Sequence, residues 1–283
     1  MAAIALGFAS AVAWGAADFL GGLKSRTLHL LPVLLISQAV GLAAVAAAAL
    51  VRGEGPPGAG ILPWVTLAAV AGTVGLAAFY RALSIGAMGV VAPISASAAA
   101  IPVAVGVIAG ERPGLVQVAG IALAIAGVAV ASYDPTTANR GGGLTPRVST
   151  GVGLALVAAL GFGLFFVGLD RASDRDLLWS LVLTRMISTG LLAIAALAMR
   201  PSFRMTGADA RAVAAVGLLD VGANALFAAA STLGLVSVVA VLGSLYPVTT
   251  LVLARFVLGE RLHRIQRAGT LGALVGVALI SAG

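Results

Sequence analysis

The chain has 283 residues, of which 60% are hydrophobic in type and 10% are charged, with a formal net charge of +7. Ordinary soluble domains contain about 25% charged residues, so this composition excludes a water-soluble globular domain. Cysteine is absent, which excludes a disulfide framework and a thiolate metal site. The excess of apolar residues needs lipid to cover it, and the sequence therefore predicts an integral membrane protein.

Apolar segments follow one another along the chain, each close to the roughly 20 residues that a helix needs to cross a bilayer. The first lacks the basic start of a signal peptide and is interpreted as a span. Little charge separates the third segment from the fourth or the eighth from the ninth, so nine or eleven spans remain alternatives to ten. The expected fold is all-α and polytopic, with ten transmembrane helices at 2–22, 30–51, 61–80, 85–109, 114–132, 149–169, 177–199, 210–231, 235–258 and 265–282.

The two halves of the chain resemble each other. Residues 110–132 align with 259–281, and the matches include Gly-Glu-Arg at the start of both segments. A segment rich in Gly and Pro at 134–148 separates the halves and is interpreted as a linker. The predicted organisation is a first five-helix repeat at 1–133 and a second at 149–283. Because five is odd, the second repeat must enter the membrane from the opposite side, which makes the two repeats inverted.

Several of these residues form a familiar pattern. Tyr246 and Pro247 are followed by Leu-Gly-Glu-Arg-Leu at 258–262 and by Gln266, and the first half repeats Gly-Glu-Arg at 110–112 with Gln117. This pattern resembles the EamA-type transporters of the drug/metabolite transporter superfamily. The resemblance implies a membrane transporter for small metabolites. It also implies an Arg in the second span of each repeat, which Arg185 fits and the aligned Gln38 does not.

Charged groups deep in a span are costly, so each needs a partner or a hydrated cavity. Asp220 is expected near the midplane with Asn224 on the same helical face, and is either a proton or cation site or a protonated carboxyl bonded to a neighbouring helix. Asp18 either faces the cavity or pairs with Lys24 or Arg26. Arg185 is expected to pair with a buried aspartate or to contact substrate.

Aromatic and hydroxyl side chains form a weaker group of candidates. Trp14 lies one turn before Asp18 and could bind a cation through its ring, although packing is the commoner role of a single Trp. Tyr80, Phe162, Ser244 and Tyr246 could line a cavity, and Pro247 is expected to kink its span. No motif for a catalytic site, a cofactor or a metal ion is present, so the sequence does not predict an enzyme.

The favoured function is secondary transport of a small metabolite, such as an amino acid or amine, by alternating access, and the protein is expected to act as an exporter. Asp18 and Asp220 are the candidate coupling or recognition groups, and protons are the expected coupling ion. The alternative is a flippase for a lipid-linked substrate, which a lateral opening lined by Arg185 would favour.

The cell membrane is the expected location. Basic residues lie between apolar segments, where lipid headgroups attract them, so the net positive charge does not indicate nucleic acid. Their distribution among the loops predicts both termini outside, whereas the resemblance implies both in the cytoplasm, and the orientation stays open. The oligomeric state does not follow from the sequence.

Overall fold

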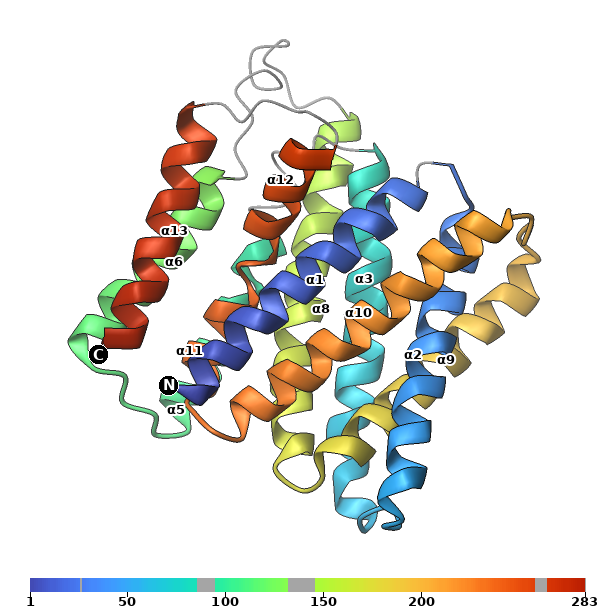
Figure 1. Ribbon diagram of the computed structural model, residues 1–283, viewed down its shortest axis with the longest axis horizontal. Coiled ribbons are helices and arrows are strands. Elements are labelled where there is room, and N and C mark those ends of the chain that lie inside the picture. The colour runs from blue at the N-terminus through green and yellow to red at the C-terminus, as the bar shows by residue number, and fades with distance from the viewer. Residues whose placement is uncertain (26, 86–94, 132–145, 258–263, 283) are drawn as a thin grey trace.

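A computed structural model describes residues 1–25, 27–85, 95–131, 146–257 and 264–282, and every regular element within these ranges is helical (Figure 1). Short 3-10 turns, η1 (Ala59–Ile61) and η2 (Ser97–Ala99), precede α3 and α5. The α-helices are α1 (Ala2–Ser25), α2 (Leu30–Arg52), α3 (Leu62–Ile85), α5 (Ala100–Ile108), α6 (Leu115–Ala131), α8 (Pro146–Ser173), α9 (Leu177–Met199), α10 (Gly207–Ser231), α11 (Val236–Gly243), α12 (Tyr246–Val257) and α13 (Arg264–Ala282).

Six of the described helices, α1, α2, α3, α8, α9 and α10, are long and apolar enough to cross a bilayer. In hydrocarbon no water can satisfy backbone N–H and C=O groups, so a spanning segment forms a helix, which satisfies them internally. These helices correspond to the first three predicted spans of each repeat. The prediction of an all-α, multi-pass membrane protein is confirmed.

The ninth predicted span is a discontinuous helix. Its first part, α11, ends at Gly243, and α12 begins at Tyr246, so the helix is interrupted just before Pro247, where a kink was expected. Proline lacks a backbone N–H and cannot continue the helical ladder through this point. The described part of the fourth predicted span forms η2 and α5. Residues 86–94, most of the predicted linker and the Gly-Glu-Arg segment of the second repeat lie outside the described residues.

Helices of the two repeats pair in a pattern with two-fold symmetry. The most extensive packing joins α3 to α8, α13 to α6, α1 to α10 and α2 to α9. A two-fold axis that exchanges the repeats places the first span of one repeat on the first span of the other. It also places the third span of one repeat on the third span of the other. The pair formed by α1 and α10 is therefore equivalent to the pair formed by α8 and α3, whereas α2 with α9 and α6 with α13 join equivalent helices.

Equivalent helices run in opposite directions where they meet. Arg52, at the end of α2, contacts Asp176 at the start of α9, whereas Gln38 of α2 contacts Arg185 further along α9. Contacts that advance along one helix while they retreat along the other define an antiparallel pair. Since α2 and α9 occupy the same place in their repeats, the two repeats are inverted, as the odd number of spans predicts.

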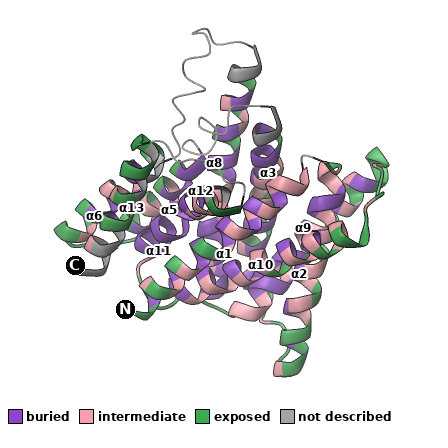
Figure 2. Cartoon of the chain, turned by 45° about the horizontal axis from the view of Figure 1, so that its top comes forward, coloured by how far each residue is buried: buried purple, intermediate pink, exposed green. Residues whose placement is uncertain are grey.

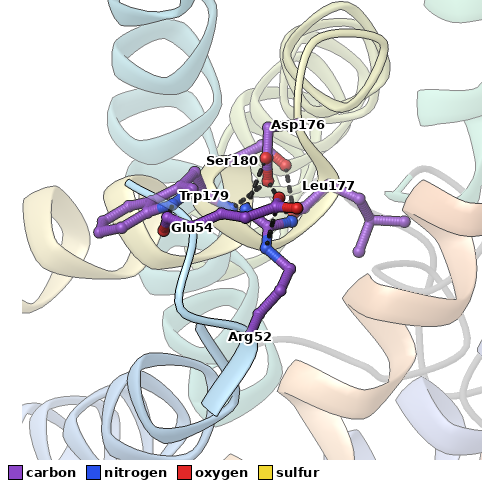
Figure 3. A network of polar contacts seen from close by, with 6 residues as sticks. All are labelled: Arg52, Glu54, Asp176, Leu177, Trp179 and Ser180. Carbon is purple, nitrogen blue, oxygen red and sulfur yellow. Dashed lines mark hydrogen bonds and ion pairs between the residues drawn. The ribbon is translucent and has the colours of Figure 1, made fainter. Parts of the chain in front are cut away.

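The contact at the end of α2 is a network of charged and polar groups (Figure 3). The Arg52 guanidinium donates to both Asp176 carboxylate oxygens, at 3.1 and 2.6 Å, and Asp176 caps α9 by accepting from the Trp179 backbone N–H at 2.8 Å. The Trp179 indole N–H donates to the Glu54 carbonyl at 3.1 Å. Partial burial opposes the charge on Asp176, but the hydrogen bonds from Arg52 and Trp179 outweigh it and lower the pKa of this carboxyl.

The pair formed by α6 and α13 depends on glycine. A Cβ atom at Gly127 would lie 2.8 Å from the Gly269 carbonyl oxygen, and one at Gly276 would lie 2.8 Å from the Gly120 carbonyl oxygen. Gly127 and Gly276 are equivalent positions of the two repeats, as are Gly120 and Gly269. The close approach is thus symmetric, and small residues let two membrane helices pack backbone to backbone.

The buried residues, purple in Figure 2, belong mainly to two clusters. The larger one is formed mainly by α1, α2, α3, α8, α9 and α10. The second joins α11 and α12 to α6 and α13, through residues such as Val241, Leu245, Ile121 and Ala273. The helix break between α11 and α12 therefore lies where the two clusters adjoin.

Candidate functional site

A cavity lies within the larger cluster, lined by residues of both repeats. The cavity volume is about 80 Å³. One water needs roughly 10–15 Å³, so the cavity has room for several waters or a small organic molecule. The aromatic lining residues are Trp14, Phe162, Phe165, Phe166 and Tyr246, and the other polar lining residues are Asp18, Gln38, Thr73, Thr184, Arg185, Ser188, Asp220, Asn224 and Ser244.

Arg185 forms the ionic centre of the cavity wall. Its guanidinium lies 2.6 Å from a carboxylate oxygen of Asp220 and donates a hydrogen bond to the Gln38 side-chain oxygen. The Arg185 side chain is 3% exposed and that of Asp220 is 23% exposed. Arg185 thus has the aspartate partner that a buried guanidinium was expected to need, and Gln38, its equivalent in the first repeat, contacts it directly.

Asp18 lines the same cavity but makes weaker polar contacts than Asp220. The Tyr80 hydroxyl donates to its carboxylate at 3.4 Å, and among the described residues Asp18 has no ion-pair partner. Lys24, one of its two expected partners, instead pairs with Asp209 at 2.7 Å, and the other, Arg26, lies outside the described residues. Asp18 therefore contributes a cavity-facing carboxyl that no described cation neutralises.

Trp14 is packed among other aromatic rings and also lines the cavity. Its indole N–H donates to the Asn224 side-chain oxygen at 2.9 Å, which joins α1 to α10 next to the cavity. Its ring packs against Phe166 and Phe227, with centroids 5.5 and 5.7 Å away, and is 8% exposed. The indole is therefore held in place by packing, while part of it lines the cavity.

The helix break brings Ser244 and Tyr246 to the cavity. The Ser244 hydroxyl donates to the Val241 carbonyl at 2.8 Å and so satisfies a backbone group at the interruption. The buried Tyr246 hydroxyl has no hydrogen-bond partner among the described residues, and the same holds for the hydroxyls of Thr73 and Thr184. Tyr80 does not line the cavity but contacts it indirectly, through Asp18.

The predicted site residues thus converge, although they come from segments far apart in the sequence. Sequence reasoning missed the cavity residues Phe165, Phe166, Thr73, Thr184 and Ser188. A signal for two of these was available, because Ser188 lies three residues after Arg185 and four after Thr184, spacings that share a helical face. Among the described residues no group of three His, Asp or Glu could hold a metal ion.

This arrangement can bind a small solute that carries both charge and apolar surface. Two carboxyls and one guanidinium line the cavity together with aromatic rings. Because Arg185 and Asp220 compensate each other, Asp18 is the acidic side chain of the cavity that pairs with no described cation. A carboxyl with aromatic neighbours suits a cationic group, which can form an ion pair and contact ring faces.

Comparisons with known proteins agree with this architecture. The model of the EamA-like transporter family matches residues 1–133 and 149–282, which are the two halves of the chain. One crystal structure, described only as that of a protein, has a TM-score of 0.80 and 18% sequence identity, covering 99% of this chain and 96% of that chain. At this identity the likeness concerns the fold alone. No curated protein matches the sequence.

Proposed function

Because the chain belongs to the EamA-like transporter family, whose members carry small solutes across membranes, we propose that it is a secondary transporter that works by alternating access. Inverted repeats support this mechanism, because exchanging the conformations of the two repeats turns a cavity open to one side into a cavity open to the other. The single observation that carries the proposal is the cavity between the repeats, lined by Asp18, Arg185 and Asp220.

The proposed substrate is a small metabolite with an amino group, such as an amine or an amino acid, which the protein exports across the cell membrane. Asp18 is the proposed partner of the ammonium group, and the aromatic lining residues would contact the rest of the molecule. Asp220 would bind or release a proton or a cation when its pair with Arg185 rearranges. A proton that competes with the substrate for Asp18 would couple the two fluxes.

The flippase alternative has less support. A groove that opens sideways to the bilayer would leave its lining residues accessible from the protein surface. Arg185, the residue expected to line such a groove, is 3% exposed and is enclosed by Gln38 and Asp220. The burial of this guanidinium favours an internal binding site for a small solute.

Transport assays with carboxyl variants test the proposal. Amines and amino acids are first screened for the ability to raise the melting temperature of the purified protein in detergent, since a ligand that binds the folded state stabilises it. Flux of each compound that binds is then measured in proteoliposomes, with and without a pH gradient. Asp18→Asn and Asp220→Asn are compared with Asp174→Asn, which alters an exposed carboxyl.

We expect the pH gradient to accelerate flux in the natural protein and in Asp174→Asn, but not in Asp18→Asn. Flux that responds to the gradient equally in Asp18→Asn would remove this residue from the coupling mechanism. Absence of flux for every compound that binds would contradict the transport function itself.

A further inference from the structure

The described Gly-Glu-Arg segment, that of the first repeat, does not line the cavity. In the first repeat it follows α5, and Glu111 lies in the connection between α5 and α6. Its carboxylate accepts hydrogen bonds from the backbone N–H groups of Val236 at 2.8 Å and Ser237 at 3.2 Å. These are the first two residues of α11, so Glu111 of one repeat binds the start of the discontinuous helix of the other.

This contact meets a need that α11 cannot meet by itself. The first N–H groups of any helix lack an intrahelical partner and are usually satisfied by a Ser, Thr, Asp or Asn side chain at the preceding position. That position here is Leu235, whose side chain makes no capping hydrogen bond. A carboxylate is also the charge that the positive end of a helix dipole favours. Glu111 thus acts as a cap supplied from another part of the chain.

The surroundings of Glu111 are shaped to hold its carboxylate. A Cβ atom at Gly106 would overlap the Glu111 carboxylate, so the absence of a side chain there leaves the space that Glu111 occupies. α11 also packs against α5, the helix that contains Gly106. The other end of α11, eight residues after its start, leads directly to Ser244 and Tyr246 in the cavity wall.

We propose that Glu111 is a positioning residue for transport: it ties α11 to the α5–α6 connection, so that the helix break keeps Ser244 and Tyr246 at the cavity while the repeats rearrange. This proposal rests on the proposed transport function. Eight residues of helix separate the clamp from the cavity by about 12 Å, so Glu111 does not contact substrate. Its loss should therefore slow the transport cycle and leave substrate affinity largely unchanged.

Two independent changes disturb the contact, one by removing the acceptor and the other by forcing it to move. Glu111→Ala removes the carboxylate, and Gly106→Ala keeps Glu111 but places a methyl group where its oxygen lies. Glu111→Gln retains one acceptor oxygen and loses the charge, so its effect should be intermediate. Asp174→Asn, which changes an exposed carboxyl, is the matched control.

Hydrogen exchange tests the clamp without reference to transport. We expect the amides of Val236 and Ser237 to exchange about ten-fold faster in Glu111→Ala and Gly106→Ala, the factor that corresponds to one hydrogen bond of ordinary strength, and less so in Glu111→Gln. Unchanged exchange in both alanine variants would overturn the clamp, whatever the transport assay shows.

Transport kinetics of the folded fraction test its role. In the same two variants we expect Vmax to fall about ten-fold while KM changes less than about two-fold, because a positioning residue acts on the cycle and not on ground-state binding. Faster exchange with unchanged Vmax would overturn the positioning role. Absence of flux in the natural protein would instead refute the transport function while the exchange result stood.

Discussion

Arg185 and Asp220 are replaced one at a time and then together. We expect the resulting changes in the free energy of unfolding to be strongly non-additive. Breaking a buried ion pair by removing one partner costs about 3–5 kcal/mol, because the other charge is left buried without compensation. Removing both partners in favour of apolar residues of similar size is often close to neutral. Arg185→Met, Asp220→Leu and the double variant therefore form an informative cycle.

The exposure of the two side chains predicts which single replacement lowers the free energy of unfolding more. After Arg185→Met the remaining carboxylate of Asp220 is 23% exposed, so water in the cavity can hydrate it, and we expect a loss near the lower limit, about 3 kcal/mol. After Asp220→Leu the remaining guanidinium is 3% exposed and keeps only the Gln38 oxygen, so we expect about 5 kcal/mol.

The double variant should lose about 1 kcal/mol, mainly because Gln38 no longer has its hydrogen-bond donor. The free energy of unfolding of all four proteins is measured by denaturant titration in mixed micelles, where the folded fraction is followed by tryptophan fluorescence. Losses in the two single variants that simply add in the double variant would refute the interpretation of Arg185 and Asp220 as a mutually compensating pair.

Two further predictions concern contacts between equivalent helices. Asp176→Ala should lower the free energy of unfolding by about 1–2 kcal/mol, because it removes the cap of α9 and the partner of Arg52. Folding lowers the pKa of Asp176, so the stability difference between the natural protein and the variant is fully present above the pKa of an unfolded aspartate. The difference is lost as the pH falls through the pKa of the folded state. A stability difference that grew on acidification would contradict this prediction. Gly276→Ala should cost about 1–3 kcal/mol by overpacking, because its Cβ would lie 2.5 Å from the Ala124 backbone nitrogen. Gly272→Ala, whose Cβ would be no closer than 3.7 Å to Gly127, is the control, and equal melting temperatures for both variants would refute this explanation of the α6 and α13 packing.

The architecture could be predicted from the sequence because its two determinants are local. Hydrocarbon requires apolar segments of nearly fixed length, and an odd number of spans per repeat requires inversion. Polar residues of the cavity could be predicted for a related reason. Asp18, Arg185, Asp220 and Asn224 are costly in lipid, so their presence within spans already indicates a hydrated or paired environment.

The apolar part of the cavity could not be predicted in this way. Phe165 and Phe166 line the cavity, while Leu160 on the same helix is 55% exposed on the surface of the protein. In a membrane protein an apolar side chain is acceptable against lipid, against another helix or against a binding site, so its type does not reveal which of these it contacts. Likewise, the sequence indicated that Lys24 was close enough to reach Asp18, but not that α10 would bring Asp209 to it.

The geometry of the two-fold axis explains why the repeats differ at their centre. Gln38 and Arg185 are related by 147 residues, and they touch each other, as residues near a symmetry axis must. An Arg at both positions would place two guanidinium groups in contact, and the second would need its own carboxylate. The position related to Asp220 by the same offset is Thr73, which has no charge. One Arg with one Asp, opposite Gln and Thr, is thus an arrangement in which the charges at these four positions balance, and this balance favours divergence between the repeats.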